Sequence, residues 1–486
     1  MAQKITIEPV TRVEGHGKVT IQLDDDGNVT QSRLHIVEFR GFERFVQGRP
    51  YWEAPVLVQR LCGICPVSHH LAAAKALDVI VGAGTGDGLT PTGDKMRRLM
   101  HYGQIFQSHA LHFFHLASPD LLFGYDADPA IRNVIGLVIT PEYTDLAVQA
   151  VLMRKFGQEI IRATAGKKIH GTGAIPGGIN KCLSLEERDE FLKGADPLNV
   201  DKMIEWAQAS VDLLKGFHGK NTDFIDNFAQ FPSNHLSIVR KDGAMDLYNG
   251  DLKAVDSDGN VIFEGVSNQE YNNYIEEEVK SWSYMKFPYI KSLGKEKGWY
   301  RVGPLARMNT VDFIPSPLAQ KEFEQFKAYT HGKPNNMCMH MHWARLIELL
   351  HAAEMMKELI NDPDIMKGDN LVTKGTKGNE GVGIIEAPRG TLFHHYRIND
   401  KDQIEMANLI VSTTNNNEPM NRSVEFVAKK MMTGQKEITE PMMNACEVAI
   451  RAYDPCLSCA THALGKMPLQ ITLVDSKNNV IDKRMS

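Results

Sequence analysis

The chain has 486 residues, and 54 Lys and Arg stand against 60 Asp and Glu, which gives a formal charge of −6. This mildly acidic balance, without a clustered basic stripe, excludes the charge pattern of a nucleic-acid-binding protein. Hydrophobic residues make up 43% of the chain, which is enough for a large core and excludes a disordered protein. No apolar run approaches the roughly 18 residues of a membrane-spanning helix, so no transmembrane segment is expected.

The N-terminal part of the chain has the pattern of β structure. Residues 4–39 contain three stretches in which apolar and polar residues alternate, and Asp26–Asn28 has the composition of a hairpin turn. From about residue 59 the pattern becomes helical. Although the length alone would allow about three domains of ~150 residues, we find no internal repeat or low-complexity linker and expect one large domain.

Helical periodicity and composition predict most of the remaining elements. Helices are expected over residues 68–80, 93–117, 142–165, 200–229, 317–360, 401–413 and 436–452. The stretch 232–300 is rich in Asp, Asn, Gly and Tyr, which predicts surface strands and loops, such as an insertion would form. Residues 468–483 predict a small β-hairpin. The expected fold is therefore mainly α with peripheral β-hairpins (α+β), a long helix bundle around a buried site.

The seven cysteines are two Cys-x-x-Cys pairs and three single residues. The pairs are Cys62 with Cys65 and Cys456 with Cys459, and Cys65 and Cys456 are 391 positions apart. A local zinc ribbon closes its pairs within roughly 15–20 residues, so these pairs can meet only if the whole fold brings the chain ends together. Thiolates are soft ligands, which favours zinc, iron–sulfur or nickel over magnesium.

Several other cysteine, histidine and glycine patterns could suggest a functional site, but we interpret them as structural. A single Cys-x-x-Cys also occurs in thiol redox enzymes, but the βαβ context of such enzymes is absent here. The single residues Cys182, Cys338 and Cys446 are expected to be buried apolar fillers. His109, His112 and His115 repeat at helical spacing among aromatic residues and predict core packing. Gly378, Gly381 and Gly383 do not follow a strand and open a helix, so they do not predict a nucleotide loop.

Two motifs together resemble those of the large, catalytic subunit of nickel–iron hydrogenases. They are Arg60-x-Cys62-Gly63-x-Cys65-x-x-x-His69 and Asp454-Pro455-Cys456-x-x-Cys459-x-x-His462. Further matching segments are Arg12–His16, Arg40–Glu43, Pro176–Gly178, Glu386–Gly390 and Val411–Asn415, so the resemblance covers nearly the whole chain. In detail, the segments around both cysteine pairs are similar to the cytoplasmic, NAD-linked bidirectional branch of this family.

The resemblance implies a metal centre and its ligands. Nickel would be bound by Cys62, Cys65, Cys456 and Cys459. Cys65 and Cys459 would also bridge to an iron that carries one CO and two cyanides. Thr413 and the backbone near Pro388 would form hydrogen bonds to the cyanides. Glu43, a backbone carbonyl near Leu409 and His462 would bind a second, hard ion, usually magnesium.

The resemblance also implies catalytic roles. Glu14 would carry protons from the thiolate of Cys456, and Arg389 would aim its guanidinium at the open position between the metals. Cys65 belongs to the same catalytic group as a bridging thiolate. His69 and Asp454 would orient the thiolates and the arginine.

The expected reaction is heterolytic H2 oxidation or proton reduction, and its electrons need a partner. The three cysteines outside the pairs are scattered, whereas a cubane cluster needs four thiolates, and no dinucleotide fingerprint is present. The resemblance implies a small partner chain with iron–sulfur clusters and, in the NAD-linked branch, diaphorase subunits that carry FMN and NAD. The alternatives are the same chemistry coupled to heterodisulfide reductase or a deazaflavin, and a non-catalytic zinc or structural homologue.

The chain continues past the last implied ligand, His462. In the resembling family a dedicated endopeptidase removes such an extension after nickel insertion by chaperones. The resemblance therefore implies a working domain of residues 1–462 and a cleaved extension of residues 463–486. The alternative is that the predicted C-terminal hairpin is permanent.

Overall fold

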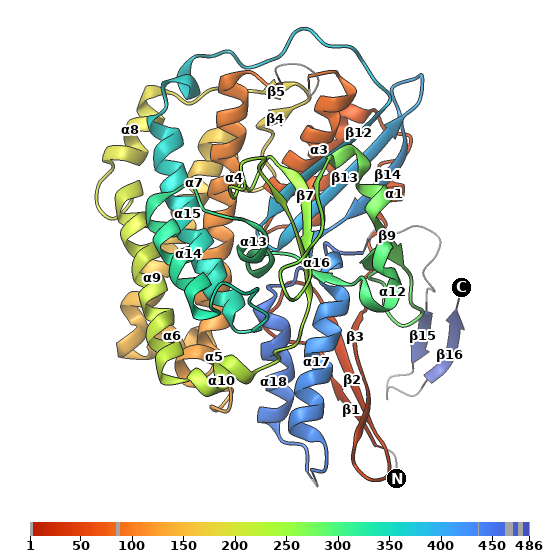
Figure 1. The fold of residues 1–486 in the computed structure, drawn as a ribbon. Helices are drawn as coiled ribbons and strands as arrows, with labels where there is room; N and C mark the ends of the chain where they lie inside the picture. The colour runs from red at the N-terminus through yellow and green to blue at the C-terminus, as the bar shows by residue number, and fades with distance from the viewer. Residues whose placement is uncertain (1–2, 84–87, 436, 462–469, 475–479, 486) are drawn as a thin grey trace.

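The computed structural model describes residues 3–83, 88–435, 437–461, 470–474 and 480–485 (Figure 1). Its long helices gather on one side of the molecule and most of its strands on the other, as Figure 1 shows. None of the helices in these described ranges is both long and apolar enough to cross a membrane. The predicted class, mainly α with added β structure, is confirmed.

Five helices form the helical side. They are α4 (Pro91–Leu111), α7 (Thr144–Ala165), α9 (Val200–Lys220), α14 (Pro317–Tyr329) and α15 (His340–Asn361). Helix α4 packs against α7 and α15, and α15 also packs against α9 and α14. Most side chains of α15 are buried on all sides of the helix, which is the pattern of a helix at the centre of a large core.

The ends of these helices follow local capping rules. Thr90 caps α4 by accepting a hydrogen bond from the backbone of Gly93, and Pro91 occupies the first turn, where its missing N–H costs nothing. Asn199 caps α9 in the same way, through the backbone of Lys202. The predicted 93–117 helix continues past α4 as a π-helical turn over His112–Ala117.

The predicted 317–360 helix is two helices rather than one. The chain leaves helical geometry between α14 and α15, where Gly332 has a φ of +78° and Pro334 follows. A proline disfavours helix both at its own position and at the residue before it, so the break has a local cause.

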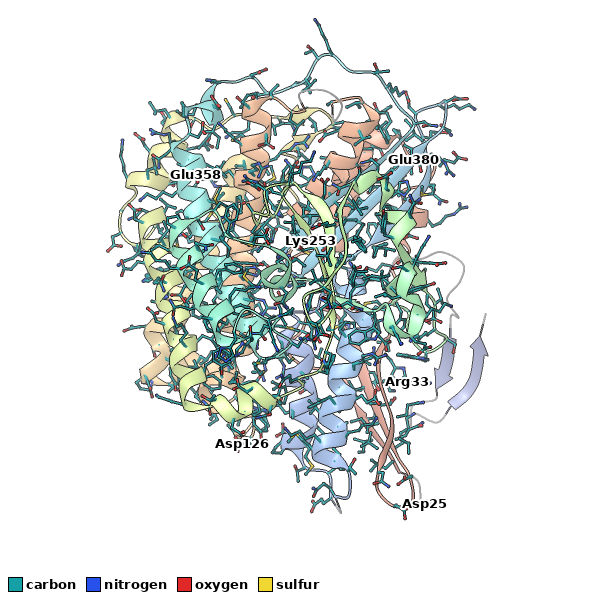
Figure 2. All side chains as sticks on the ribbon, in the orientation of Figure 1. Asp25, Arg33, Asp126, Lys253, Glu358 and Glu380 are labelled. Carbon is teal, nitrogen blue, oxygen red and sulfur yellow. A yellow bond between two sulfur atoms is a disulfide. The ribbon has the colours of Figure 1, made fainter. Side chains whose placement is uncertain are left out.

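The other helices connect these elements. They are α1 (Phe42–Phe45), α2 (Ala54–Leu57), α3 (Pro66–Ile80), α5 (Ser118–Phe123), α6 (Val134–Ile139), α8 (Leu185–Lys193), α10 (Thr222–Asn227), α11 (Tyr271–Tyr274), α12 (Gly294–Lys297), α13 (Pro304–Thr310), α16 (Ser412–Asn415), α17 (Asn417–Met432) and α18 (Glu440–Ala452). The helices outside the predicted ranges are α1, α2, α5, α6, α8, α11, α12, α13 and α17. Figure 2 shows how side chains fill the space between the elements, while labelled charged residues such as Asp126 and Glu358 lie at the periphery.

A buried antiparallel sheet packs on α3. It contains β12 (Glu380–Ala387), β13 (Gly390–Ile398) and β14 (Ile404–Ile410), in that order. Almost every residue of β12 and β13 is buried. The predicted helix over residues 401–413 is therefore wrong, because pairing with β13 in the core outweighs the helix propensity of that segment.

The N-terminal and C-terminal hairpins agree with the prediction. Strands β1 (Gln3–Ile7), β2 (Gly17–Leu23) and β3 (Val29–Ile36) form an antiparallel sheet. The turn between β2 and β3 is closed by a hydrogen bond of 3.0 Å from the Asp24 backbone N–H to the Asn28 carbonyl. At the other end, β15 (Gln470–Val474) pairs with β16 (Val480–Met485) in antiparallel register.

The stretch 232–300 is a sheet region that is only partly superficial. Its strands are β6 (Asn234–Val239), β7 (Asp251–Val255), β8 (Val261–Val266), β9 (Ile275–Glu278), β10 (Phe287–Ile290) and, just beyond, β11 (Tyr300–Arg301). Five of the six residues of β6 are buried, and β6 lies against β12 and β13. All four residues of β10 are buried as well, so the expectation of surface strands is wrong for both β6 and β10. A further small pair, β4 (Ala174–Ile175) and β5 (Gly178–Ile179), lies near α3 and α4.

Two glycines of β12 allow the sheet to approach α3 closely. A Cβ on Gly383 would lie 2.2 Å from the carbonyl oxygen of Ala72, and one on Gly381 would lie 2.2 Å from that of Ala76. These contacts are with helix backbone, which cannot move aside. Close packing thus explains Gly381 and Gly383, two of the three glycines that superficially suggested a nucleotide loop.

We predict that Gly383→Ala destabilises the fold, because its methyl group must displace the backbone of α3. The expected loss in the free energy of unfolding is about 1–3 kcal/mol, measured by thermal or denaturant unfolding. Gly378→Ala is the matched control, since a Cβ there meets nothing within 4 Å. Equal stability of the two variants would contradict the close-packing explanation.

Candidate metal centre

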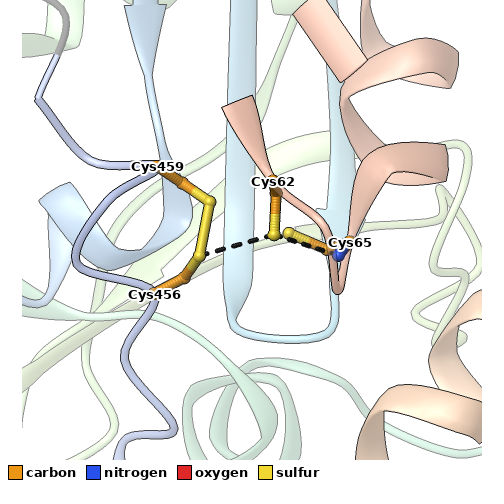
Figure 3. Close-up of side chains that lie close together, drawn as sticks. All are labelled: Cys62, Cys65, Cys456 and Cys459. Carbon is orange, nitrogen blue, oxygen red and sulfur yellow. Dashed lines mark hydrogen bonds between the residues drawn. A yellow bond between two sulfur atoms is a disulfide. The ribbon is translucent and has the colours of Figure 1, made fainter. Parts of the chain in front are cut away.

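The two cysteine pairs meet in the core of the protein. The four sulfur atoms of Cys62, Cys65, Cys456 and Cys459 all lie within 4.8 Å of one another, and all four residues are buried (Figure 3). Between the pairs, Cys62 Sγ lies 3.5 Å from Cys456 Sγ. In the described part of the chain, this is the one group of His, Cys, Asp or Glu side chains found to converge as a metal site.

The first pair is held in a tight turn that leads into α3. Cys62 Sγ accepts hydrogen bonds from the backbone N–H groups of Ile64, at 3.3 Å, and Cys65, at 3.0 Å. The carbonyl of Ile64 in turn accepts hydrogen bonds from the side-chain amides of Gln104, at 2.7 Å, and Gln107, at 2.8 Å. Helix α4 therefore fixes the middle of this turn.

The second pair lies in the loop after α18. In this loop, Asp454 has a left-handed backbone with a φ of +54°. The N–H of Cys456 donates to Thr413 Oγ1 at 2.9 Å, and the N–H of Leu457 donates to the Glu14 carbonyl at 2.9 Å. This loop is thus tied to both the N-terminal segment and α16.

Cys456 and Cys459 are joined by a disulfide in the structure (Figure 3). A metal ion binds cysteine as the thiolate, so this pair must be reduced for all four sulfurs to serve as ligands. The donor set fits the implied group: four converging sulfur atoms are soft ligands of the type that nickel accepts.

The two thiols of the first pair have opposite pKa shifts. Burial opposes ionisation of Cys62, but the hydrogen bond from Cys65 and the positive charge of Arg389 outweigh burial and lower the pKa of Cys62. The pKa of Cys65 is raised because its thiol donates to Cys62 and because it is buried. The site therefore stabilises a first thiolate at Cys62.

Arg389 is a buried cation beside the sulfurs. Its Nε donates to the Asp454 carbonyl at 2.5 Å, and its Nη2 donates to Asp454 Oδ1 at 3.1 Å. Burial disfavours the charge, but Asp454 and the cysteines nonetheless raise the pKa of Arg389, so the guanidinium remains charged. Its Nη1 is buried and has no hydrogen-bond partner among the described residues.

His69 lies close to the first cysteine pair on α3. Burial lowers its pKa to about 3, so the ring is neutral at physiological pH. Its Nδ1 lies 3.1 Å from Nε2 of His394, which orients the ring. His69 therefore adds no charge to the site, and its ring is held in a fixed orientation beside the cysteines.

A small enclosed cavity adjoins Cys65 and Cys456. Its lining comprises Cys65, Ser68, His69, Ala387, Pro388, Arg389, Leu392, Val411, Ser412, Thr413 and Cys456. Two polar atoms in this lining, Ser68 Oγ and Arg389 Nη1, are buried without a hydrogen-bond partner in the described residues. Because buried polar groups are normally paired, the cavity has the composition of a site for small polar ligands next to the sulfurs.

Glu14 contacts the second pair directly. Cys456 Sγ lies 2.9 Å from Glu14 Oε2, so its thiol can donate to this carboxylate once the disulfide is reduced, and the hydroxyl of Ser458 bonds to Glu14 Oε1. The neighbouring Gly15 has a φ of +83°, and a Cβ there would lie 2.6 Å from the backbone N of Ser458. Glycine at this position is what allows Glu14 to approach Cys456.

Glu43 lies on the short helix α1, which packs against β14. Its Oε1 accepts a hydrogen bond of 2.9 Å from the N–H of Leu409, so this contact uses the Leu409 amide and not its carbonyl. Burial raises the pKa of Glu43 to about 7, which the positive charge of Lys286 only partly offsets. The third implied ligand, His462, lies outside the described residues.

The residues expected to be structural are mostly core residues. Cys338 and Cys446 are buried, as predicted, whereas Cys182 is only half-buried, so its assignment as a buried filler is wrong. His109 bonds to Glu348 at 2.9 Å, and His112 bonds to the Arg451 carbonyl at 2.7 Å. Both histidines have partners within the core.

Sequence reasoning missed Ser68, Gln104 and Gln107. The two glutamines lie on the face of α4 that meets the first cysteine turn, and this proximity is a property of the fold. Ser68 lies inside the first motif, between Cys65 and His69. Its place in that motif could have identified it as a residue of the site.

Comparison with known proteins agrees with this geometry. The family model described as nickel-dependent hydrogenase matches residues 40–130 and 220–462, and one described as HoxL-like matches residues 4–39. The stretch 232–300 lies within the matched range. It is therefore not an insertion relative to this family.

Two full-length relatives are similar in sequence. The chain is 52% identical to the NAD-reducing hydrogenase HoxS subunit beta of Cupriavidus necator, with 100% of both chains covered. It is 41% identical to a chain of the F420-non-reducing hydrogenase of Methanothermobacter thermautotrophicus, with 99% of both covered.

Solved structures agree with these relatives. A crystal structure of an NAD+-reducing [NiFe]-hydrogenase in the H2-reduced state superposes with a TM-score of 0.90 at 51% identity, covering 95% of this chain and 99% of that one. A Ni-Fe-Se hydrogenase from D. vulgaris Hildenborough shares the fold, with a TM-score of 0.75 at 23% identity over 95% of this chain and 100% of that one. The family match, the full-length relatives and the four converging sulfurs show that this chain belongs to the nickel-dependent hydrogenase family, as a catalytic subunit.

Proposed function

We propose that the chain interconverts H2 with protons and electrons at a nickel–iron centre held by Cys62, Cys65, Cys456 and Cys459. The observation that carries this proposal is the convergence of the four buried sulfur atoms within 4.8 Å. When bound, the nickel and an iron with one CO and two cyanides supply the position where H2 is split heterolytically. Cys65 and Cys459 would hold the iron as well as the nickel.

Arg389 supplies a fixed positive charge beside this position. Its guanidinium is held by Asp454 through two hydrogen bonds, and it is buried away from bulk water. A preoriented charge in a dry site stabilises negative charge that develops during reaction, because no solvent has to reorganise. Asp454 and His69 are positioning residues in this proposal. Thr413 and the backbone at Pro388 line the cavity in which the cyanides would be bound.

Glu14 is the proposed first proton carrier. Its Oε2 lies 2.9 Å from Cys456 Sγ, which can donate to it as a thiol once the disulfide is reduced, and Ser458 binds its other oxygen. A carboxylate at hydrogen-bond distance from a thiol can take its proton and pass it outward. This contact joins the metal centre to the N-terminal segment.

A magnesium site is proposed at Glu43, the Leu409 carbonyl and His462. Glu43 Oε1 is already occupied by the Leu409 N–H, so Oε2 is the oxygen available to the ion. A divalent cation there would favour the ionised carboxylate, which burial otherwise disfavours.

Electrons must leave the chain through partner subunits. Four of the seven cysteines form the candidate metal centre, and of the remaining three, Cys338 and Cys446 are buried singly. We propose an iron–sulfur small subunit next to this chain and diaphorase subunits with FMN and NAD beyond it. The NAD link is supported by 52% identity to a subunit of an NAD-reducing hydrogenase. The proposed compartment is the cytoplasm, where reducing conditions keep the thiols available.

A second candidate acceptor of the electrons is a heterodisulfide reductase rather than NAD. The relatives named F420-non-reducing hydrogenases also align along 99% of the chain, at 41% identity. The same hydrogen chemistry would then feed a heterodisulfide reductase. The two acceptors differ in the partner subunits and not in the site described here.

We also propose that residues 463–486 are removed by a maturation endopeptidase after chaperones insert nickel. The extension follows His462, the last implied ligand, so its removal would leave that residue at the end of the chain. Mass spectrometry of active protein should find a chain that ends at His462. An active chain that retains the extension would contradict this proposal.

The dependence of NAD reduction on partner subunits can be tested with the chain that carries its nickel and iron. Purified alone, it should show H2-dependent dye reduction but no reduction of NAD, because it has no route for electrons to NAD. Adding the iron–sulfur and diaphorase subunits should restore H2-dependent NAD reduction. NAD reduction by the isolated chain would refute the partner requirement, while no H2 activity in either preparation would refute the proposed function.

We expect Glu14→Gln to block proton exit while leaving nickel bound. H2 oxidation should fall by about 10²-fold, as for loss of a general base, and nickel content should equal that of the wild type. Exchange of hydrogen isotopes with water should also fall, whereas para-to-ortho hydrogen conversion, which needs no proton exit, should continue.

Glu8→Gln makes the same chemical change at an exposed residue of the N-terminal region and serves as the control. It should leave both isotope exchange and H2 oxidation near the wild-type values. Loss of nickel from Glu14→Gln would instead assign Glu14 a structural role.

A further inference from the structure

Ser68 is a buried hydroxyl next to the candidate metal centre with no assigned task. Its side chain is 0% exposed, and its Oγ has no hydrogen-bond partner in the parts of the chain that the structure describes. It lies on the first turn of α3, and its backbone N–H donates to the Cys65 carbonyl at 3.2 Å. This bond ties the backbone of Ser68 to that of Cys65. Leaving such a hydroxyl unpaired costs free energy, so a partner is expected.

The cavity beside Cys65 offers three hydrogen-bond donors. Arg389 Nη1 and Ser68 Oγ line it and have no partner among the described residues. Thr413 Oγ1 accepts from the Cys456 N–H, which leaves its own O–H free to donate. Ser412 also lines the cavity, but its hydroxyl already donates to the Gly390 carbonyl at 2.7 Å.

The remaining wall of the cavity is apolar. Ala387, Leu392 and Val411 contribute side chains that offer no hydrogen bonds. The cavity therefore has one polar and one apolar part. That division matches the iron ligands of the proposed function: the nitrogen of a cyanide is anionic and accepts hydrogen bonds strongly, whereas the oxygen of CO accepts them weakly.

We propose that the Ser68 hydroxyl donates a hydrogen bond to the nitrogen of one of the two cyanides on the iron. This inference rests on the proposed function, since it assigns a binding residue to that same site. The donor is held in place by the first turn of α3, through the bond between its backbone and Cys65. Ser68 thereby adds a third side-chain donor to Arg389 and Thr413.

The hydrogen bond has an electronic consequence that can be measured. A donor at the cyanide nitrogen withdraws electron density from the iron, which leaves less density for back-donation into CO. Removing the donor increases back-donation and weakens the C–O bond. The CO stretching band should therefore move to lower wavenumber, and the separation of the two cyanide bands should change.

The test is infrared spectroscopy of the metal-loaded complex in wild type, Ser68→Ala and Ser412→Ala. We expect the CO band of Ser68→Ala to shift to lower wavenumber by more than its line width. Ser412→Ala removes a hydroxyl from the same cavity, but one already bonded to Gly390, so its bands should coincide with those of the wild type. Ser68→Thr keeps the hydroxyl and should restore the wild-type band positions.

Unshifted bands in Ser68→Ala, or an equal shift in Ser412→Ala, would overturn the assignment of Ser68. If Ser68→Ala fails to acquire iron, Ser68→Cys gives the same comparison, because a thiol is of similar size and a much weaker donor. Wild-type protein without CO and cyanide bands would refute the proposed function itself. The two failures are therefore distinguishable.

Discussion

The structure depends on bringing two short cysteine loops from opposite ends of the chain into one buried position. Such contacts between distant segments are made by backbone as well as side chains: Leu457 donates to the Glu14 carbonyl, and Cys456 donates to Thr413. Burial makes the sulfurs costly to ionise. The surrounding fold offsets this cost with the charge of Arg389 and the backbone N–H groups that face Cys62.

The position of Arg389 in turn depends on a second buried network. Arg307 is fully buried and donates to Glu348 at 2.5 and 2.6 Å and to Glu386 at 2.5 Å. Glu386 lies at the end of β12, directly before the turn that carries Arg389. Removing one partner from such a network leaves an unpaired buried charge, which is strongly destabilising. The network therefore holds the turn that presents Arg389 to the sulfurs.

The sequence predicted the features that have local causes. Helical periodicity located α3, α4, α7 and α9, and the spacing of the cysteines predicted that the chain ends would meet. The strand β14 was mistaken for a helix because its identity depends on pairing with β13, which no local pattern records. Ser68 was missed for a similar reason. No local pattern shows that the fold places its hydroxyl, without a hydrogen-bond partner among the described residues, in a cavity beside the cysteines.

The central claim is that the four cysteines hold nickel next to iron. X-ray absorption at the nickel edge of the mature protein tests it most directly, because the signal reports the atoms around nickel alone. The account predicts a sulfur-rich nickel site with iron as a close neighbour, and loss of that signal when any of the four cysteines is replaced. Zinc in a four-sulfur site, with no nickel and no iron neighbour, would contradict it.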